Sequence, residues 1–271
     1  MSSLRVLRPQ GQVSYGNQGR VVLVTGGCGG IGRAICEKFA ASGAAVMAVD
    51  VQPPPFEMAA GIVFQPADVT RDEQCAAAVD AAIARFGGLD VLVNTAAIQP
   101  TDSYRPLHLL PSEQWERLIA VNLTGYANMA RHGLRAMLAQ GSGVIVNLAS
   151  AQGHRTARGV SAYGAAKAGN LMQTMQWGVE YARSNIRVVS VSPGAIDTPL
   201  VRASLAEQGG AAELANRHPL GRIGQPEEVA NAVLWLACSD ASFITGADLA
   251  VDGGLGALAS FAEPYAQSPK T

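Results

Sequence analysis

Short apolar runs rich in valine, leucine and isoleucine alternate along this chain with longer stretches of helical periodicity. The runs lie at residues 21–24, 46–49, 62–64, 89–93, 143–148, 186–191 and 249–251. Strands that are buried on both faces of a parallel sheet have this composition, and the intervening stretches are long enough to form crossover helices. The alternation therefore predicts an α/β fold with one doubly wound parallel sheet of about seven strands and helices on both faces.

Helical periodicity covers residues 31–41, 71–85, 112–139, 163–183 and 226–238. Gly87 and Gly88 end the second of these stretches, and Pro226 begins the last, with acidic residues in its first turn. The composition does not change between residues 20 and 254, and this part of the sequence contains no linker. We therefore predict one domain over residues 20–255, between an N-terminal arm (residues 1–19) and a C-terminal tail (residues 256–271).

Charge, hydrophobicity and cysteine content exclude several classes of protein. Hydrophobic residues make up 48% of the chain and the net charge is −1, which excludes a disordered protein and leaves no basic surface for nucleic acid or an anionic membrane. The start of the sequence lacks the apolar segment of a secretory signal, and no apolar run reaches the length of about 18 residues that spans a membrane. The four cysteines form no C-x-x-C pair, and the four histidines lack metal-ligand spacing. We expect a cytoplasmic protein without a metal site.

A glycine-rich segment joins the first predicted strand to the first predicted helix. It reads Thr25-Gly26-Gly27-Cys28-Gly29-Gly30-Ile31-Gly32. Glycines permit a tight turn and the close approach of a pyrophosphate, while the helix N-terminus offers free N–H groups and a positive dipole end. A flexible loop without a ligand would use similar residues, but the strand–loop–helix context favours a Rossmann-type dinucleotide site.

Asp50 ends the second predicted strand, 18 positions after Gly32. A carboxylate at this place can accept hydrogen bonds from the ribose diol of NAD, and it repels the 2′-phosphate of NADP. The glycine segment also contains no basic residue to attract such a phosphate. We therefore predict NAD as the cofactor. Two points oppose this prediction. Arg33 is close in sequence to the glycine segment, and an aspartate at the end of a strand is also an ordinary turn residue.

Tyr163 and Lys167 lie four positions apart in a predicted helix, so they share one face of that helix. A free tyrosine is a poor base at neutral pH, but a neighbouring ammonium stabilises the phenolate. Ser150 follows the fifth predicted strand, at the sheet edge where doubly wound folds bind ligands. Lys167 is also one of only three lysines in the chain, and lysine, unlike arginine, can release a proton. Together these residues predict a site that exchanges a proton with an alcohol or carbonyl oxygen.

Over residues 20–254 the chain closely resembles the classical short-chain dehydrogenases/reductases. The motifs that carry the resemblance occur in the order of the family: Thr25-Gly26 with Gly30-Ile31-Gly32, Asp68-Val69, Asn94, Asn122, Ser150, Tyr163 with Lys167, Pro193-Gly194 with Thr198, and Asp252-Gly253-Gly254. Many motifs in register are more specific than any one of them. The resemblance implies hydride transfer between NAD(H) and a secondary alcohol or ketone.

The resemblance also implies roles for individual residues. Tyr163 is the acid/base, and Ser150 hydrogen-bonds the substrate oxygen. Lys167 binds the nicotinamide ribose and lowers the pKa of Tyr163, while Asn122 holds a water of the proton relay. The expected cofactor contacts are Gly26, Gly30, Ile31, Gly32, Asp50, Asp68, Val69, Asn94, Ala96, Tyr163, Lys167, Pro193, Gly194, Ile196 and Thr198.

One motif departs from the family pattern. After the fourth strand the family usually has N-N-A-G, whereas this chain has Asn94-Thr95-Ala96-Ala97. Thr95 can still form hydrogen bonds that support the sheet. Ala97 would be strained if the backbone there required a positive φ, and we expect it to alter the shape of the pocket.

Two other functions remain open at this stage. The segment from Arg222 to Ala230 also occurs in NADPH-dependent 3-oxoacyl reductases, although Asp50 argues against that cofactor. A dinucleotide-binding regulatory protein without catalysis is the second alternative, against which stands the intact set Asn122, Ser150, Tyr163 and Lys167.

Because the family is mostly tetrameric, we expect a homotetramer, with a dimer as the next choice. We also expect helix residues such as Met172 and Met175 to pack in the core or in an interface. The predicted partner is a small alcohol or ketone, and we expect neither nucleic acid nor a membrane as a partner.

Overall fold

The computed structural model describes residues 11, 13–206 and 208–258. Most of the predicted N-terminal arm (1–10 and 12) and most of the predicted tail (259–271) lie outside the described residues. Seven parallel strands form one sheet, which confirms the predicted doubly wound sheet of about seven strands, and their order is β3-β2-β1-β4-β5-β6-β7. Their bounds are β1 Val21–Thr25, β2 Ala45–Asp50, β3 Ile62–Pro66, β4 Val91–Asn94, β5 Gly143–Leu148, β6 Ile186–Pro193 and β7 Asp248–Val251.

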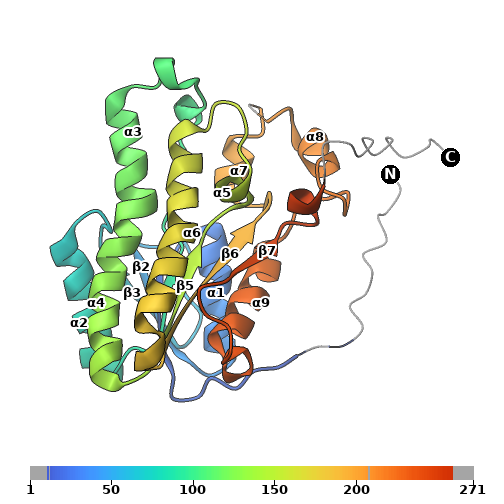
Figure 1. The fold of residues 1–271 in the computed structure, drawn as a ribbon. Coiled ribbons are helices and arrows are strands. Elements are labelled where there is room, and N and C mark those ends of the chain that lie inside the picture. The colour runs from blue at the N-terminus through green and yellow to red at the C-terminus, as the bar shows by residue number, and fades with distance from the viewer. Residues whose placement is uncertain (1–10, 12, 207, 259–271) are drawn as a thin grey trace.

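Helices cover both faces of this sheet (Figure 1). Their bounds are α1 Gly30–Ala41, α2 Asp72–Phe86, α3 Ser112–Ile119, α4 Gly125–Gln140, α5 Ala151–His154, α6 Ser161–Tyr181, α7 Pro199–Ala203, α8 Ala211–Asn216 and α9 Pro226–Ala237. Successive strand residues point to opposite faces. Val22 and Val24 accordingly pack in the core with α1 and α9, while Leu23 packs in the opposite core with α2 and α4. The doubly wound fold therefore contains two apolar cores, one on each side of a sheet whose central strands are buried.

The helix predicted over residues 112–139 is interrupted in the structure. Between α3 and α4 the backbone forms a π-helical turn, Ala120–Thr124. Such a turn inserts an extra residue, and it commonly occurs at functional sites. Here Asn122 is completely buried, and its side chain accepts a hydrogen bond from Ile98 N and donates one to Ile98 O, both at 2.8 Å. The helical periodicity on either side of the turn does not reveal this interruption.

Three short helices, α5, α7 and α8, lie outside the stretches of helical periodicity in the sequence. Ser150 caps α5 by accepting a hydrogen bond from Gln152 N at 3.1 Å, and Thr198 caps α7 by accepting one from Val201 N at 3.3 Å. Helices of one or two turns carry too few apolar residues to show a period. For α5 and α7, the cap residues are the local signal that could have predicted them.

No helix among the described residues has the length and apolar character needed to cross a membrane.

Candidate active site

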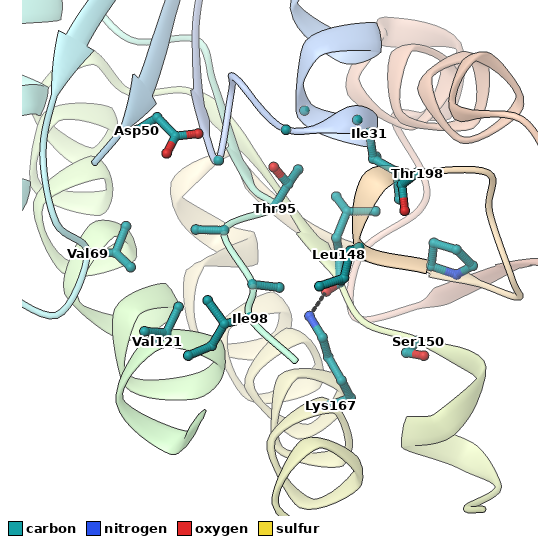
Figure 2. A pocket seen from close by; sticks show the side chains of 18 of the residues that line it. Ile31, Asp50, Val69, Thr95, Ile98, Val121, Leu148, Ser150, Lys167 and Thr198 are labelled. Carbon is teal, nitrogen blue, oxygen red and sulfur yellow. Dashed lines mark hydrogen bonds between the residues drawn. The ribbon is translucent and has the colours of Figure 1, made fainter. Parts of the chain in front are cut away.

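A pocket of about 580 Å³ opens at the carboxyl ends of the strands. It lies where the strand order reverses, between β1 and β4, which is the ligand-binding place of open α/β sheets. The predicted residues that line it are Gly26, Gly30, Ile31, Gly32, Asp50, Asp68, Val69, Ala96, Ser150, Tyr163, Lys167, Pro193, Gly194, Ile196 and Thr198. Asn94 and Asn122 are not among the lining residues. Residues from distant parts of the sequence therefore converge on one site (Figure 2).

The glycine loop forms one wall of the pocket, and this wall is bare backbone because side chains would not fit there. A Cβ atom on Gly32 would lie 2.1 Å from the Gly26 carbonyl oxygen, and one on Gly30 would lie 2.8 Å from Thr198 Cγ2. Gly26 itself has a positive φ of 64°. No side chain caps the N-terminus of α1, whose first N–H groups adjoin the pocket. A cradle of bare backbone at a helix N-terminus fits a pyrophosphate group.

Asp50 lines the pocket beside this loop. Its carboxylate accepts hydrogen bonds from Cys28 N at 3.1 Å and from Val51 N at 2.8 Å. Arg33 forms an ion pair with Glu37 at 2.7 Å and lies 4.0 Å from the centroid of the Phe56 ring. The guanidinium of Arg33 is thus held by its own neighbours, and Asp50 is the charged side chain that adjoins the glycine loop.

Cys28 is not an activated thiol. Burial and the nearby Asp50 carboxylate raise its pKa to about 11. The thiolate, which is the reactive form, is therefore scarce at neutral pH. This agrees with a role as a small residue in the loop.

Asn94 differs from the prediction that it lines the groove. Its side chain is completely buried beneath the pocket, where Nδ2 donates to Asn147 Oδ1 at 2.9 Å, and Asn147 in turn donates to Thr174 at 3.0 Å. The cause is its place as the last residue of β4, paired with Asn147 of β5. Asn94 therefore ties the sheet to α6 rather than presenting its amide to the pocket.

The departure from the family pattern after β4 causes no backbone strain. Thr95 Oγ1 donates to Thr25 O, and Thr95 N donates to Thr25 Oγ1 at 3.1 Å, so the expected support of the sheet is present. Ala97 lines the pocket without a positive φ, a conformation that Asn185 alone adopts among the described non-glycine residues. The condition for strain at Ala97 is not met, and its methyl group instead takes space in the pocket.

Ser150 is fixed by the packing of α5 against α6. A Cβ atom on Gly153 would lie 2.8 Å from Lys167 O, so the two helix backbones touch at this glycine. The Ser150 side chain caps α5 and hydrogen-bonds the Tyr163 side chain. Hydroxyl groups from β5–α5 and from α6 thereby meet at the pocket, as predicted.

Tyr163 and Lys167 both have strongly shifted pKa values. Burial raises the pKa of Tyr163 to about 12, while the hydrogen bond to Ser150 lowers it and Tyr104 raises it further. Burial also lowers the pKa of Lys167 to about 7. Lys167 Nζ lies 5.7 Å from the centroid of the Tyr163 ring and donates its hydrogen bonds to other groups. The lowering of the Tyr163 pKa by Lys167 therefore stays a prediction.

Tyr126 is a site residue that the sequence does not reveal. Lys167 Nζ donates to Leu148 O at 2.7 Å and to Tyr126 Oη at 3.1 Å, and Tyr126 Oη donates to the same carbonyl at 3.0 Å. Tyr126 is almost completely buried, and burial raises its pKa well above 10. Its position, one helical turn after Asn122, is the one signal that could have drawn attention to it.

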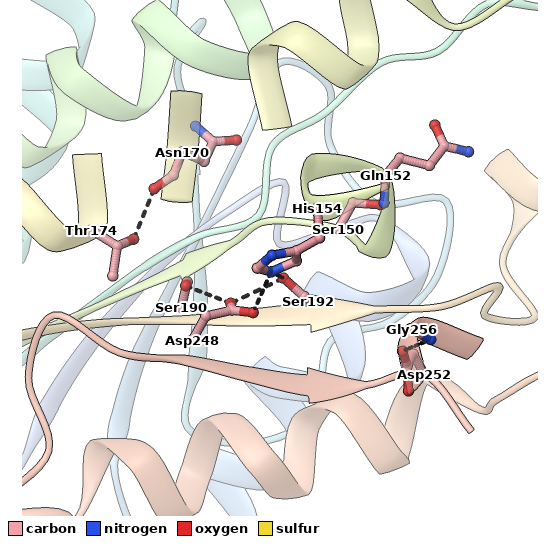
Figure 3. A network of polar contacts seen from close by, with 10 residues as sticks. All are labelled: Ser150, Gln152, His154, Asn170, Thr174, Ser190, Ser192, Asp248, Asp252 and Gly256. Atoms are coloured by element: carbon pink, nitrogen blue, oxygen red, sulfur yellow. Dashed lines mark hydrogen bonds and ion pairs between the residues drawn. The ribbon is translucent and has the colours of Figure 1, made fainter. Parts of the chain in front are cut away.

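A polar cluster fastens the far end of α5 to the edge of the sheet (Figure 3). Asp248 accepts hydrogen bonds from Ser190 at 2.6 Å and Ser192 at 2.9 Å, and its other oxygen lies 2.8 Å from His154 Nε2. This is not a hydrolytic triad, because Ser192 and Asp248 both face Nε2 of the imidazole, whereas a triad uses its two nitrogens separately. The cluster instead anchors the turn that begins at Ser150.

Comparisons with known proteins agree with this geometry. A family model described as enoyl-(acyl carrier protein) reductase matches residues 26–256. The chain is 44% identical over 246 residues to a cis-4-hydroxycyclohexanecarboxylate dehydrogenase of Sinomonas cyclohexanicum, which covers 88% of this chain and 97% of that protein. It is 37% identical to a 3-oxoacyl-[acyl-carrier-protein] reductase of Thermotoga maritima, over 88% of this chain and 98% of that one.

The fold is likewise similar to that of solved structures. The ligand-free aldohexose dehydrogenase of Thermoplasma acidophilum superposes with a TM-score of 0.85 at 36% sequence identity, over 91% of this chain and 98% of that one. The relatives match nearly their whole lengths, so the similarity includes the pocket as well as the sheet.

Proposed function

Since the chain belongs to the classical short-chain dehydrogenase/reductase family, we propose that it is an NAD(H)-dependent oxidoreductase that interconverts a secondary alcohol and its ketone, with Tyr163 as the acid/base. The observation that carries the proposal is the convergence of Ser150, Tyr163 and Lys167 on the pocket that also contains the glycine cradle and Asp50. A regulatory protein without catalysis would have no need to keep a tyrosine, a serine and a buried lysine together at that place.

Residues of this chain supply the proton transfer, the hydrogen bond to the substrate and the contacts that hold the cofactor. NAD(H) supplies the hydride acceptor or donor when it is bound. Tyr163 moves the proton of the substrate hydroxyl, and Ser150 donates a hydrogen bond to the substrate oxygen. Lys167 holds the nicotinamide ribose, and its buried ammonium provides positive charge near the phenol. Asn122 maintains the wall of the site through its two bonds to Ile98.

Three features support NAD over NADP. Asp50 places a carboxylate in the pocket beside the glycine loop. No basic residue lies between Gly26 and Gly32, and Arg33 is engaged by Glu37 and Phe56. A 2′-phosphate near Asp50 would meet negative charge without a compensating cation. Measuring kcat/KM for NADH and NADPH with one ketone tests this preference, which a higher value for NADPH would overturn.

We propose a cyclic secondary alcohol as the substrate. The relative with 44% identity is a dehydrogenase of a hydroxycyclohexane carboxylate, and the pocket combines the Tyr163 and Ser150 hydroxyls with apolar lining such as Ile98 and Leu200. The test is a screen for NAD reduction over hydroxycyclohexane carboxylates, simple cyclic alcohols, sugars and open-chain secondary alcohols. Turnover of a cyclic alcohol supports the proposal. Turnover confined to sugars or open-chain alcohols contradicts the substrate class but not the reaction.

A second candidate is a reductase of 3-oxoacyl thioesters. It is favoured by the similarity to the Thermotoga maritima reductase and by the description of the matching family model. An acetoacetyl thioester in the same screen, with NADH and with NADPH, distinguishes the two. Faster reduction of the thioester with NADPH than of any cyclic ketone with NADH favours this candidate.

We also propose a homotetramer in the cytoplasm, with a dimer as the next choice. The support is an exposed apolar stripe on α6, where Met172, Met175 and Val179 are 61%, 47% and 79% exposed, so these methionines do not lie in the core. Apolar stripes of this kind mark protein interfaces. The four free cysteines suit a reducing compartment. Light scattering of the purified protein tests the oligomeric state.

A further inference from the structure

His218 is a buried histidine that neither the family motifs nor the proposed chemistry uses. It follows α8 and is only 2% exposed. Its Nε2 atom lies 3.0 Å from Ala195 N, and its Nδ1 atom lies 2.9 Å from Leu214 O. Both ring nitrogens therefore have partners, and both partners are backbone groups.

The two partners fix the protonation state of the ring. A carbonyl oxygen only accepts hydrogen bonds, so Nδ1 must carry the proton that it donates to Leu214 O. The Ala195 N–H only donates, so Nε2 must be unprotonated. His218 thus fits this place only as the neutral imidazole. A second proton, on Nε2, would put two N–H groups against each other.

Ala195 lies in the segment Pro193–Thr198, which we call the nicotinamide loop because the family resemblance assigns it to that end of the cofactor. A Cβ atom on Gly194 would lie 2.8 Å from His218 Nε2, so the imidazole packs directly against the loop backbone. On its other side the loop is held by Gly224, whose N–H donates to Ala195 O at 2.8 Å. At its end, Thr198 packs against Gly30 of the glycine cradle. A shift of Ala195 would therefore be transmitted to the pocket.

We propose that His218 is a positioning residue, which holds the nicotinamide loop in its cofactor-binding geometry by accepting the hydrogen bond of the Ala195 N–H. The proposal rests on the proposed NAD(H) function. It concerns a residue outside the pocket, which acts only through the loop. It also connects the loop to α8, because the other nitrogen of the same ring is bonded to Leu214.

The charged groups around His218 are engaged with other partners. Behind the loop lies a cavity of about 270 Å³, lined by His218 together with Arg222, Glu228 and Asp252. Glu228 is paired with Arg222 at 2.6 Å, and the carboxylate of Asp252 accepts from Gly254 N and Gly256 N. On the neighbouring elements, Glu213 is paired with Arg217 and Asp197 with Arg202. The imidazole is therefore tied to the loop by the uncharged hydrogen bond from Ala195 N–H.

Titration of NADH into the protein at pH 8, followed by its fluorescence, tests the proposal. His218→Gln offers an oxygen acceptor for the Ala195 N–H, so its Kd for NADH should stay near the wild-type value. His218→Leu removes the acceptor and should raise the Kd about tenfold. His132→Gln is the matched control, because His132 lies on α4 and contacts Asp72.

Hydrogen exchange of the nicotinamide loop gives a readout that needs no cofactor. We expect faster exchange of Ala195 N–H, after correction for intrinsic rates, in His218→Leu than in the wild type, but not in His218→Gln. An unchanged Kd and unchanged exchange in His218→Leu would overturn the proposal, as would a His218→Gln variant that loses NADH binding and Ala195 protection as fully as His218→Leu does. If His218→Leu fails to fold, the wild type still decides, because an Ala195 N–H that exchanges as fast as an unprotected amide would overturn the proposal. Wild-type protein that does not bind NADH at pH 8, yet shows the expected exchange, would refute the cofactor proposal and leave the positioning role intact.

Discussion

The ammonium of Lys167 lies 3.1 Å from the hydroxyl of Tyr126 and 5.0 Å from the centroid of its ring. Both groups also donate to the same carbonyl oxygen, that of Leu148 at the end of β5. The lysine of the proposed active site is thus held by a buried tyrosine and a strand carbonyl. This arrangement affects the pKa of Lys167, and it leads to the next two predictions.

Tyr126→Phe should impair catalysis while preserving the fold. The ring keeps its packing, and Leu148 O keeps the bond from Lys167, so we expect a loss of about 1 kcal/mol in the free energy of unfolding. The ammonium loses an acceptor, which should lower the pKa of Lys167 further and reduce kcat/KM about fivefold. The basic limb of the pH–rate profile should move to lower pH. An unmoved profile would show that the Tyr126 hydroxyl does not act on Lys167.

Lys167→Met should stabilise the protein at neutral pH although it removes activity. Burial lowers the pKa of Lys167 to about 7, so between about pH 7 and 10.5 the unfolded chain binds a proton that the folded chain lacks. The stability of the wild type therefore gains from this group as the pH rises through that window and loses it as the pH falls. We expect the variant to be more stable by roughly 2–4 kcal/mol at pH 7, with the difference narrowing towards pH 10.

Thermal unfolding of both proteins at several pH values measures this difference. Circular dichroism of the cofactor-free proteins is sufficient. A variant that is less stable than the wild type at pH 7, or a difference that grows with pH, would contradict a buried lysine with a lowered pKa.

Asp50→Ser should weaken the preference for NAD. The serine cannot accept two hydrogen bonds from a ribose diol as a carboxylate does, and it removes the charge that would repel a 2′-phosphate. We expect the ratio of kcat/KM for NADH to that for NADPH to fall at least about tenfold. The measurement is steady-state kinetics with both cofactors and one ketone. Glu37→Gln, which changes a carboxylate paired with Arg33 on α1, is the control for a general effect of charge.

Gly153→Ala should separate Ser150 from Tyr163. The added methyl would lie 2.8 Å from Lys167 O, and neither backbone can yield without moving α5 away from α6. We expect kcat to fall at least about tenfold and stability to fall by roughly 1–3 kcal/mol. Gly164→Ala is the matched control, because its nearest contact would be an ordinary 3.4 Å to Thr156 Oγ1. Equal losses in both variants would refute a specific role for the contact at Gly153.

The strands and several residues of the pocket follow from patterns that a sequence carries locally. Each buried strand is a continuous apolar run, and residues such as Asp50 and Ser150 come directly after their strands. A parallel sheet then brings such residues to one edge. The seven strands, the two-sided helix layers and these two pocket residues could be predicted for this reason, whereas other contacts, such as Val69 and Thr198, follow from the family resemblance.

Side-chain direction could not be predicted in the same way. The buried orientation of the Asn94 side chain depends on Asn147, which lies 53 residues later in the sequence, and on Thr174, which lies a further 27 residues beyond Asn147. The π-helical turn at Asn122 leaves the helical period intact on both sides, and the role of Tyr126 depends on a carbonyl of another strand. These features are set by tertiary contacts, which neither periodicity nor motif spacing records.

The proposed role of Tyr163 is to transfer the substrate proton at a nicotinamide site. Tyr163→Phe removes the hydroxyl and keeps the ring, so the cofactor cradle should be unchanged. The most direct measurement compares the variant and the wild type in NADH binding and in single-turnover hydride transfer with an alcohol that the wild type oxidises. We expect a Kd for NADH within about threefold of the wild-type value and a rate reduced at least about 100-fold. A variant that binds NADH normally and still turns over at the wild-type rate would contradict this role of Tyr163.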